Sequence, residues 1–340
     1  MPIKHLVLPG GGTAGFCLVG ALQKLHDAGV WNLDDIKSIY SVSAGSLIAV
    51  LIALKFNWDT IVDYLLNRPW SNVYKMNLTN IIDIFLKKGF YDTDFFVTFF
   101  KPFFDSRDIS MNITLSELYE ITGVDVHFCT VEMTSLTFIG ITHETHPDLE
   151  VLKAIQMSAA YPLIVSPVFN DGKYYIDGGL LCNYPIDMCL KKYPNKDEVL
   201  GMGNSIRSFS QEITSNSSLF EFIEDLLFKM VMNLSNRIHN NGNPDEIDNY
   251  VSIPIPKVTM TNIQNTFSDK ELRRKLITDG AECAATFLAA HGIITEDEPK
   301  DEPKDEPKDE PKDNNISSVS QENKETINYP TQLSDAMVFC

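Results

Sequence analysis

The chain has 340 residues, of which 44% are hydrophobic and 22% are charged, and its formal net charge is −18. This acidic composition argues against binding to a nucleic-acid backbone and against electrostatic docking on anionic lipid, so any contact with a membrane would have to be apolar. The longest purely apolar run, residues 47–54, is far shorter than the about 20 residues that a transmembrane helix needs.

The six cysteines are scattered, with neither a C-x-x-C pair nor paired histidine spacing. This pattern predicts no disulfide framework and no metal site. The first residues, "MPIKHLVLPGGG", run into a short apolar strand and do not resemble a signal peptide. We therefore expect a cytoplasmic protein whose contact with membranes, where it has any, is peripheral.

Strand and helix patterns alternate over most of the chain. Buried strands are predicted at "HLVLPG", "SIYSV", "DVHFCTVEM", "LTFIGIT", "KYYID", "VLGMGN" and "YVSIPIP". Helices are predicted at residues 16–28, 46–56, 58–67 and 219–237, and after Ser268, where Ser268 and Glu271 would form a capping box. The alternation predicts an α/β fold with a mostly parallel sheet, helices on both faces, and a site at the carboxyl ends of the strands.

Six phenylalanines lie in the segment "TDFFVTFFKPFF". Phe95, Phe99 and Phe103 share one face of a helix, and the other three lie beside them. Packing in the core explains this pattern more simply than an acyl-chain channel or an interfacial lid does. Pro102 is expected to stop or kink the helix and to turn Phe103 and Phe104 outward.

The chain changes character near residue 292. Four consecutive D-E-P-K units occupy residues 297–312, and proline at every fourth position forbids a regular helix. Residues 291–340 hold 13 acidic and 5 basic side chains, a composition that cannot bury a core. We predict a folded domain over residues 1–292 and a disordered, acidic tail over residues 293–340.

The first predicted strand ends in "PGGGTAG", so that Gly10, Gly11 and Gly12 precede a helix that Gly15 opens. The spacing fits the dinucleotide-binding pattern G-x-G-x-x-G, but the second strand lacks the acidic residue that such a site needs at its end. The backbone N–H groups of a glycine loop at a helix N-terminus also suit an oxyanion. A tight turn without a ligand would be the default if no other motif accompanied it.

The second strand-to-helix turn reads "YSVSAGS" over residues 40–46. It matches the nucleophile elbow G-x-S-x-G at Ser43 and Gly45, but Ser41 stands in place of the first glycine. Serine is also a preferred N-cap of helices, so Ser43 alone does not identify a nucleophile.

A nucleophilic Ser43 would need a base. Asp177 ends the predicted strand "KYYID", and Gly178 and Gly179 let the chain turn sharply after it, with the carboxylate directed into the crevice of the sheet. Aspartate followed by glycine is also common in hairpin turns. None of the seven histidines stands in a context that marks it as catalytic, although a Ser-Asp-His triad that includes one of them stays open.

The glycine loop, the serine elbow and the Asp-Gly-Gly strand end, in this order, resemble the patatin-like phospholipase family. The stretches "GFYDTDFF", "AIQMSAAYPLIVSPV" and "LITDGAECAATFLAAHG" agree with it, so the resemblance spans roughly residues 5–290, with its motifs within about 5–190. It implies a three-layer α/β/α sandwich and a Ser-Asp dyad without histidine. The residues that it assigns are the nucleophile Ser43, its base Asp177, the oxyanion loop Gly10, Gly11 and Gly12, and the supporting motif residues Gly15, Ser41, Gly45, Gly178 and Gly179.

The resemblance also implies a function. A patatin-like protein would hydrolyse fatty-acyl esters of phospholipids or neutral lipids at a membrane or micelle surface, without calcium, a metal site or a cofactor. The expected chemistry is acyl transfer in two steps through a covalent acyl-enzyme. A catalytically impaired relative that binds lipid or protein is the alternative, and a nucleotide-dependent oxidoreductase is a third interpretation.

Two positions depart from the family pattern. Ala14 stands where many members carry arginine, and Ser41 stands where the elbow has glycine. We interpret Ser41 as a small residue that a strained turn tolerates, so that Ser41→Gly should keep or raise the rate of acylation.

Overall fold

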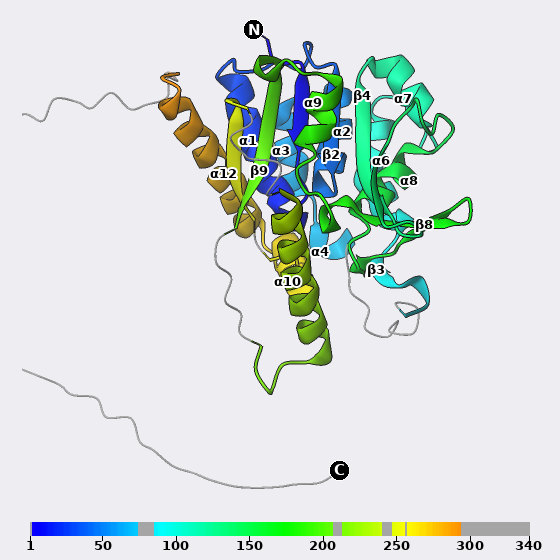
Figure 1. Cartoon of the computed structure of the whole chain (residues 1–340). Coiled ribbons are helices and arrows are strands. Elements are labelled where there is room, and N and C mark those ends of the chain that lie inside the picture. The colour runs from blue at the N-terminus through cyan, green and yellow to red at the C-terminus, as the bar shows by residue number, and fades with distance from the viewer. Residues whose placement is uncertain (1, 74–84, 207–212, 240–246, 256, 294–340) are drawn as a thin grey trace, which may run out of the picture. The chain divides into compact units, whose positions relative to one another are not determined.

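The computed structural model describes residues 2–73, 85–206, 213–239, 247–255 and 257–293 (Figure 1). Apart from Ile293, the predicted acidic tail lies outside the described residues. The domain boundary near residue 292 therefore stays a prediction.

Within the described residues, the main sheet has eight strands in the order β10-β9-β1-β2-β4-β8-β7, with β5 paired to β4. The neighbours from β10 to β4 are parallel, whereas β5, β7 and β8 add antiparallel pairs. A separate parallel pair joins β3 and β6. The strands are β1 (His5–Leu8), β2 (Ser38–Val42), β3 (Gly89–Tyr91), β4 (Asp125–Glu132), β5 (Thr137–Ile141), β6 (Leu163–Val165), β7 (Val168–Asn170), β8 (Lys173–Asp177), β9 (Val199–Ile206) and β10 (Tyr250–Ile255).

Helices cover both faces of the main sheet. Side chains alternate along a strand, so Leu6, Leu8 and Ile39 enter one core cluster while Val7 and Tyr40 enter another. The first cluster is closed by α1 (Gly15–Asp27), α2 (Ala44–Ala53), α3 (Trp58–Asn67), α4 (Trp70–Val73), α6 (Thr93–Asp105), α7 (Leu115–Thr122), α8 (Val151–Ala159), α11 (Met260–Ser268) and α12 (Lys270–Ala290), and the second by α9 (Ile186–Lys192). Figure 1 shows α9 in front of the sheet and α1, α2 and α3 behind it. The predicted three-layer α/β/α sandwich is confirmed.

Helices α1 and α12 approach each other closely at two glycines. A Cβ on Gly20 would lie 1.9 Å from the backbone oxygen of Ile277, and a Cβ on Gly280 would lie 1.9 Å from that of Cys17. Only glycine permits such an approach of two backbones. The contact holds α1 against α12. The glycine loop precedes α1 in the chain, so its position depends on how α1 is held.

The capping box predicted at Ser268 is wrong. Helix α12 begins at Lys270, and its N-cap is Asp269, whose carboxylate accepts the N–H groups of Glu271 and Leu272 at 2.8 and 3.1 Å. The hydroxyl of Ser268 instead donates to the carbonyl of Gln264 at 2.7 Å, within α11. Ser268 is the last residue of α11, so its hydroxyl satisfies that helix and the carboxylate next to it meets the N-terminus of α12.

The phenylalanine-rich segment forms α6, which continues through Pro102 to Asp105. Phe103 and Phe104 are 3% and 0% exposed, so the prediction that Pro102 turns them outward is wrong. The ring of Phe103 packs edge-on against Phe56 at 4.9 Å between centroids. The free energy gained by burying these rings exceeds the free energy lost with the one backbone hydrogen bond that proline removes from the helix.

Candidate active site

The glycine loop follows β1 and leads into α1. Gly11 and Gly12 have φ values of 150° and 56°, in the region that favours glycine. The N–H of Gly10 donates to Asn183 Oδ1 at 3.0 Å, and its carbonyl accepts from the amides of Asn183 and Asn204 at 3.3 and 2.9 Å. Both polar groups of Gly10 are therefore engaged. By contrast, no described residue accepts a hydrogen bond from the N–H of Gly11 or Gly12.

Ser43 lies at the sharp turn between β2 and α2. Its φ of 51° and ψ of −121° form a conformation that a residue with a Cβ adopts only when its surroundings impose it. Ser41, by contrast, lies inside β2 and is paired with Leu8 of β1. The backbone strain expected around position 41 is thus found at Ser43 itself.

Three fully buried serines lie behind this turn. Ser158 of α8 accepts the N–H of Ser43 at 3.0 Å and the hydroxyl of Ser46 at 2.9 Å, and it donates to a backbone carbonyl of β4 at 2.6 Å. Ser41 donates to another carbonyl of β4 at 3.0 Å and lies 3.1 Å from the oxygen of Ser46. This network ties β2, α2, α8 and β4 together, and it offsets the strain at Ser43.

Asp177 is the last residue of β8, and only 2% of its surface is exposed. Burial raises the pKa of Asp177 to about 6, and hydrogen bonds from the Ser43 hydroxyl and the Gly179 N–H offset only part of that effect. The bond from Gly179 is 2.7 Å long. Asp177 is therefore charged at neutral pH, yet it is basic enough to accept a proton from a neighbouring hydroxyl.

Ser43 and Asp177 border a cavity of about 210 Å³. Of the other predicted site residues, Gly11, Gly12, Gly15 and Gly179 also border it, whereas Gly10, Ser41, Gly45 and Gly178 do not. Much of the remaining wall is aromatic and includes Trp70, Phe95, Phe96, Phe99, Phe228 and Phe267. Part of the phenylalanine-rich helix thus serves both the core and the cavity. A ligand with a long apolar chain and one polar group, placed at Ser43, would match this cavity wall chemically.

Asn183 and Ser158 are site residues that the sequence patterns did not reveal. Asn183 borders the cavity, and a Cβ on either Gly10 or Gly179 would lie 2.8 Å from its side-chain oxygen. It links the glycine loop to the turn after Asp177. Its only signal in the sequence is a single amide within the stretch "GLLCNYPI".

Three features are absent from the part of the chain that the structure describes. None of the described histidines borders the cavity. No cluster of three or more His, Cys, Asp or Glu side chains is placed to hold a metal ion. No described helix combines the length and the hydrophobicity needed to cross a bilayer.

Comparison with known proteins identifies the family. The family model of the patatin-like phospholipases matches residues 6–190, which include the glycine loop, Ser43 and Asp177. The chain belongs to the patatin-like phospholipase family. The resemblance predicted from the three motifs is confirmed.

Two viral proteins are similar to this patatin-like chain. The probable lipid hydrolase 463L of Invertebrate iridescent virus 6 is 28% identical over 262 residues, which cover 76% of this chain and 85% of that protein. The uncharacterized protein R571 of Acanthamoeba polyphaga mimivirus is 31% identical over 189 residues, which cover 55% of this chain and 61% of R571.

The patatin-like fold also has a solved counterpart. The crystal structure of VipD from Legionella pneumophila superposes with a TM-score of 0.53 and 15% sequence identity. The match covers 86% of this chain and 67% of VipD. At this identity the similarity bears on the fold alone.

Proposed function

We propose that this patatin-like protein is a serine lipid acyl hydrolase of the calcium-independent phospholipase A type, which cleaves fatty-acyl esters of phospholipids or neutral lipids. The observation that carries the proposal is the buried pair of Ser43 and Asp177 at the edge of an aromatic cavity. The similarity to a probable lipid hydrolase supports the same class of substrate. The protein would act from the cytoplasm at the surface of a membrane or micelle.

In the first step, the acyl chain occupies the aromatic part of the cavity and the ester carbonyl lies at Ser43. Asp177 accepts the proton of the Ser43 hydroxyl while Oγ attacks the carbonyl carbon. The N–H groups of Gly11 and Gly12 are available to the developing oxyanion. Because the N–H of Gly10 already donates to Asn183, we assign Gly10 the role of fixing the loop.

The tetrahedral intermediate then collapses and releases the alcohol, which takes the proton from Asp177. The acyl group stays on Ser43 as an ester. In the second step, Asp177 removes a proton from water, the resulting hydroxide attacks the acyl carbonyl, and Ser43 leaves and recovers the proton. The products are a free fatty acid and a lysolipid or alcohol.

Labelling with a fluorophosphonate tests this proposal. The wild-type protein should be labelled at Ser43 and should release fatty acid from a phospholipid, whereas Ser43→Ala should lose both properties. Heat-unfolded wild-type protein serves as the control for nonspecific labelling. A folded wild-type protein that is neither labelled nor active would favour the catalytically impaired relative instead.

The rate should depend on pH through Asp177. Because the base must be deprotonated and its pKa is raised to about 6, kcat/KM should fall about tenfold per pH unit below that value and level off above about pH 7. A soluble short-chain ester, assayed between about pH 4.5 and 8.5, avoids effects of pH on lipid vesicles. A profile that stays flat down to about pH 5 would contradict the raised pKa of the base.

Ser41→Gly is expected to lower activity, contrary to the expectation from the sequence. The change removes a buried hydroxyl that donates to a carbonyl of β4 and lies beside Ser46. The lost hydrogen bond and a looser elbow should cost about 2 kcal/mol of stability and about tenfold in the acylation rate. Urea unfolding and burst-phase kinetics measure the two effects.

Ser41→Ala is the matched control, because it keeps the Cβ and removes only the hydroxyl. If the hydroxyl matters, Ser41→Ala should show most of the loss that Ser41→Gly shows. An acylation rate that is unchanged or higher in Ser41→Gly would restore the simpler interpretation, in which the turn merely tolerates Ser41.

A further inference from the structure

Helix α10 (Leu219–His239) carries a row of exposed apolar side chains along one face. Their spacing of three or four residues places them above one another on the helix surface. We call this row the apolar stripe, and its members are Leu219 (73% exposed), Phe222 (49%), Leu226 (44%), Met230 (52%) and Leu234 (41%). A helix of a folded domain normally turns such a row toward the core, so a partner outside the described residues is indicated.

The opposite side of α10 is anchored, which keeps the stripe directed outward. The buried carboxylate of Asp225 accepts from the Lys257 ammonium at 2.7 Å, and Glu224 accepts from the N–H of Met260 at 2.8 Å. The orientation of the helix is therefore set by buried polar contacts that α10 would lose if it turned the stripe inward.

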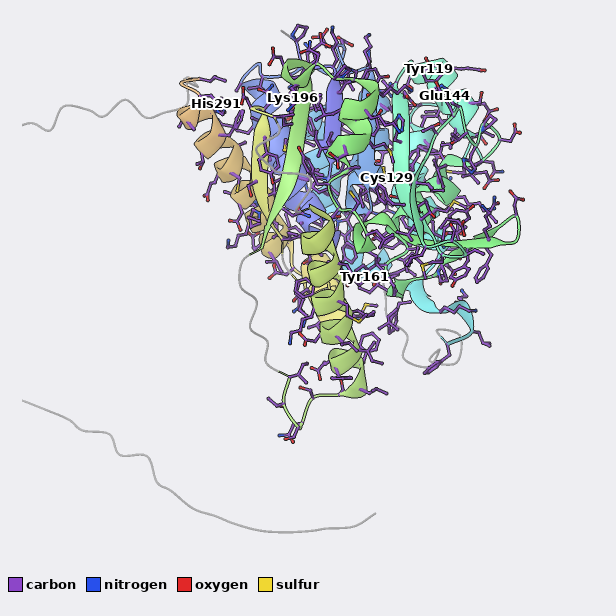
Figure 2. All side chains as sticks on the ribbon, viewed as in Figure 1. Tyr119, Cys129, Glu144, Tyr161, Lys196 and His291 are labelled. Atoms are coloured by element: carbon purple, nitrogen blue, oxygen red, sulfur yellow. The ribbon has the colours of Figure 1, made fainter. Side chains whose placement is uncertain are left out.

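The anchored side of α10 also borders the candidate active site. Phe228 and Val231 form part of the cavity wall that Ser43 and Asp177 share. Tyr161, which is labelled in Figure 2, also borders this cavity. Burial, together with the carboxylates of Asp177 and Glu224, raises the pKa of its hydroxyl. Helix α10 thus has the cavity on one side and the apolar stripe on the other. In Figure 1, α10 lies at the lower end of the sheet, where the strands β1 and β2 end.

We propose that the apolar stripe of α10 docks on the surface of a zwitterionic lipid bilayer and brings the cavity to its substrate. The inference rests on the proposed function, since the lipid at the stripe is the source of the ester at Ser43. The net charge of −18 disfavours an anionic surface, which would repel the chain, and a row of apolar side chains gains binding energy by entering the boundary between headgroups and acyl chains.

Vesicle flotation tests the stripe without hydrolysis, in protein that carries Ser43→Ala. The parent should float with phosphatidylcholine vesicles, and admixed phosphatidylserine should not strengthen binding. Adding Leu226→Asp and Met230→Asp, two positions outside the cavity wall, should lower the partition coefficient about tenfold or more. The matched control adds Ile121→Asp and Leu136→Asp, two exposed apolar residues elsewhere (57% and 60%), and should bind like the parent.

A second assay, in protein with an intact Ser43, shows that the stripe variant is folded. It should hydrolyse a soluble short-chain ester at the wild-type rate and lose activity only on vesicles. Equal vesicle binding by the stripe variant and the control would overturn the proposal. So would a parent that forms a dimer without binding vesicles and becomes monomeric when the stripe is changed. Vesicle binding through the stripe by a protein that hydrolyses no ester would refute the proposed function and leave the docking surface standing.

Discussion

Asp177→Asn is expected to lower kcat/KM for ester hydrolysis by about 10⁴-fold. The amide keeps the shape of the side chain and can still accept the hydrogen bond from the Gly179 N–H, but it cannot take the proton of Ser43. The hydroxyl of Ser43 would remain in place without a base. Steady-state kinetics on a soluble ester and on a phospholipid measure the loss.

The same variant should be at least as stable as the wild type at neutral pH. The pKa of Asp177 in the folded protein is raised by burial to about 6, so its folding contribution is most favourable at low pH and is lost as the pH rises through that value. Removing the buried charge should therefore raise the free energy of unfolding by on the order of 3 kcal/mol near pH 7.5 and change it little near pH 4. Thermal unfolding at both pH values separates loss of chemistry from loss of fold.

Turnover near the wild-type level in Asp177→Asn would contradict the dyad. Another base would then have to serve Ser43, and no histidine borders the cavity among the residues that the structure describes. The histidines that follow Ser43 in the chain would have to be replaced one at a time.

The local parts of the site could be predicted because each lies in consecutive residues after a strand. Gly10 to Gly12 follow β1, Ser43 follows β2, and Asp177 ends β8, so strand patterns and short motifs were enough to propose them as candidates. The strand patterns place both Ser43 and Asp177 at the carboxyl ends of strands. Their assignment as a dyad without histidine followed only from the family resemblance, because residues 134 positions apart share no local signal.

The supporting contacts could not be predicted in the same way. Ser158 and Asn183 act through hydrogen bonds to the backbone of Ser43 and Gly10, 115 and 173 residues away in the chain. Such pairs depend on how α8 and the turn after β8 pack against the sheet, which periodicity does not encode. For the same reason Ser41 appeared to be merely tolerated, since its hydrogen-bond acceptor lies on β4.

Competition between neighbouring residues explains the incorrect cap. Ser268 and Asp269 both favour an N-cap position, and the sequence does not show that α11 extends through Ser268. Pro102 was misjudged because the phenylalanines around it are buried by other elements, among them Phe56. At Pro102, tertiary packing thus outweighed a local preference.

Gly45→Ala is expected to lower the acylation rate about 100-fold while leaving the protein folded. Gly45 lies in the first turn of α2, and a Cβ there would lie 2.7 Å from the carbonyl oxygen of Pro9 and 2.8 Å from that of Leu8. Both are backbone atoms at the end of β1, so α2 would have to move away from the strand that carries the glycine loop. Ser43 would move with α2, out of line with the proposed oxyanion donors, and a displacement of about 1 Å is enough for a loss of this size.

Stability should change less than activity in Gly45→Ala. Overpacking costs about 1–3 kcal/mol, and alanine regains up to about 1 kcal/mol through its higher helix propensity. Gly15→Ala is the matched control at the start of α1, because its Cβ would meet the Cβ of Ala44 at an ordinary 3.4 Å. Burst-phase acylation by a chromogenic ester should therefore fall far more in Gly45→Ala than in Gly15→Ala. Equal rates in the two variants would mean that the close contact between α2 and β1 does not position Ser43, and that the serine network behind the elbow is sufficient for it.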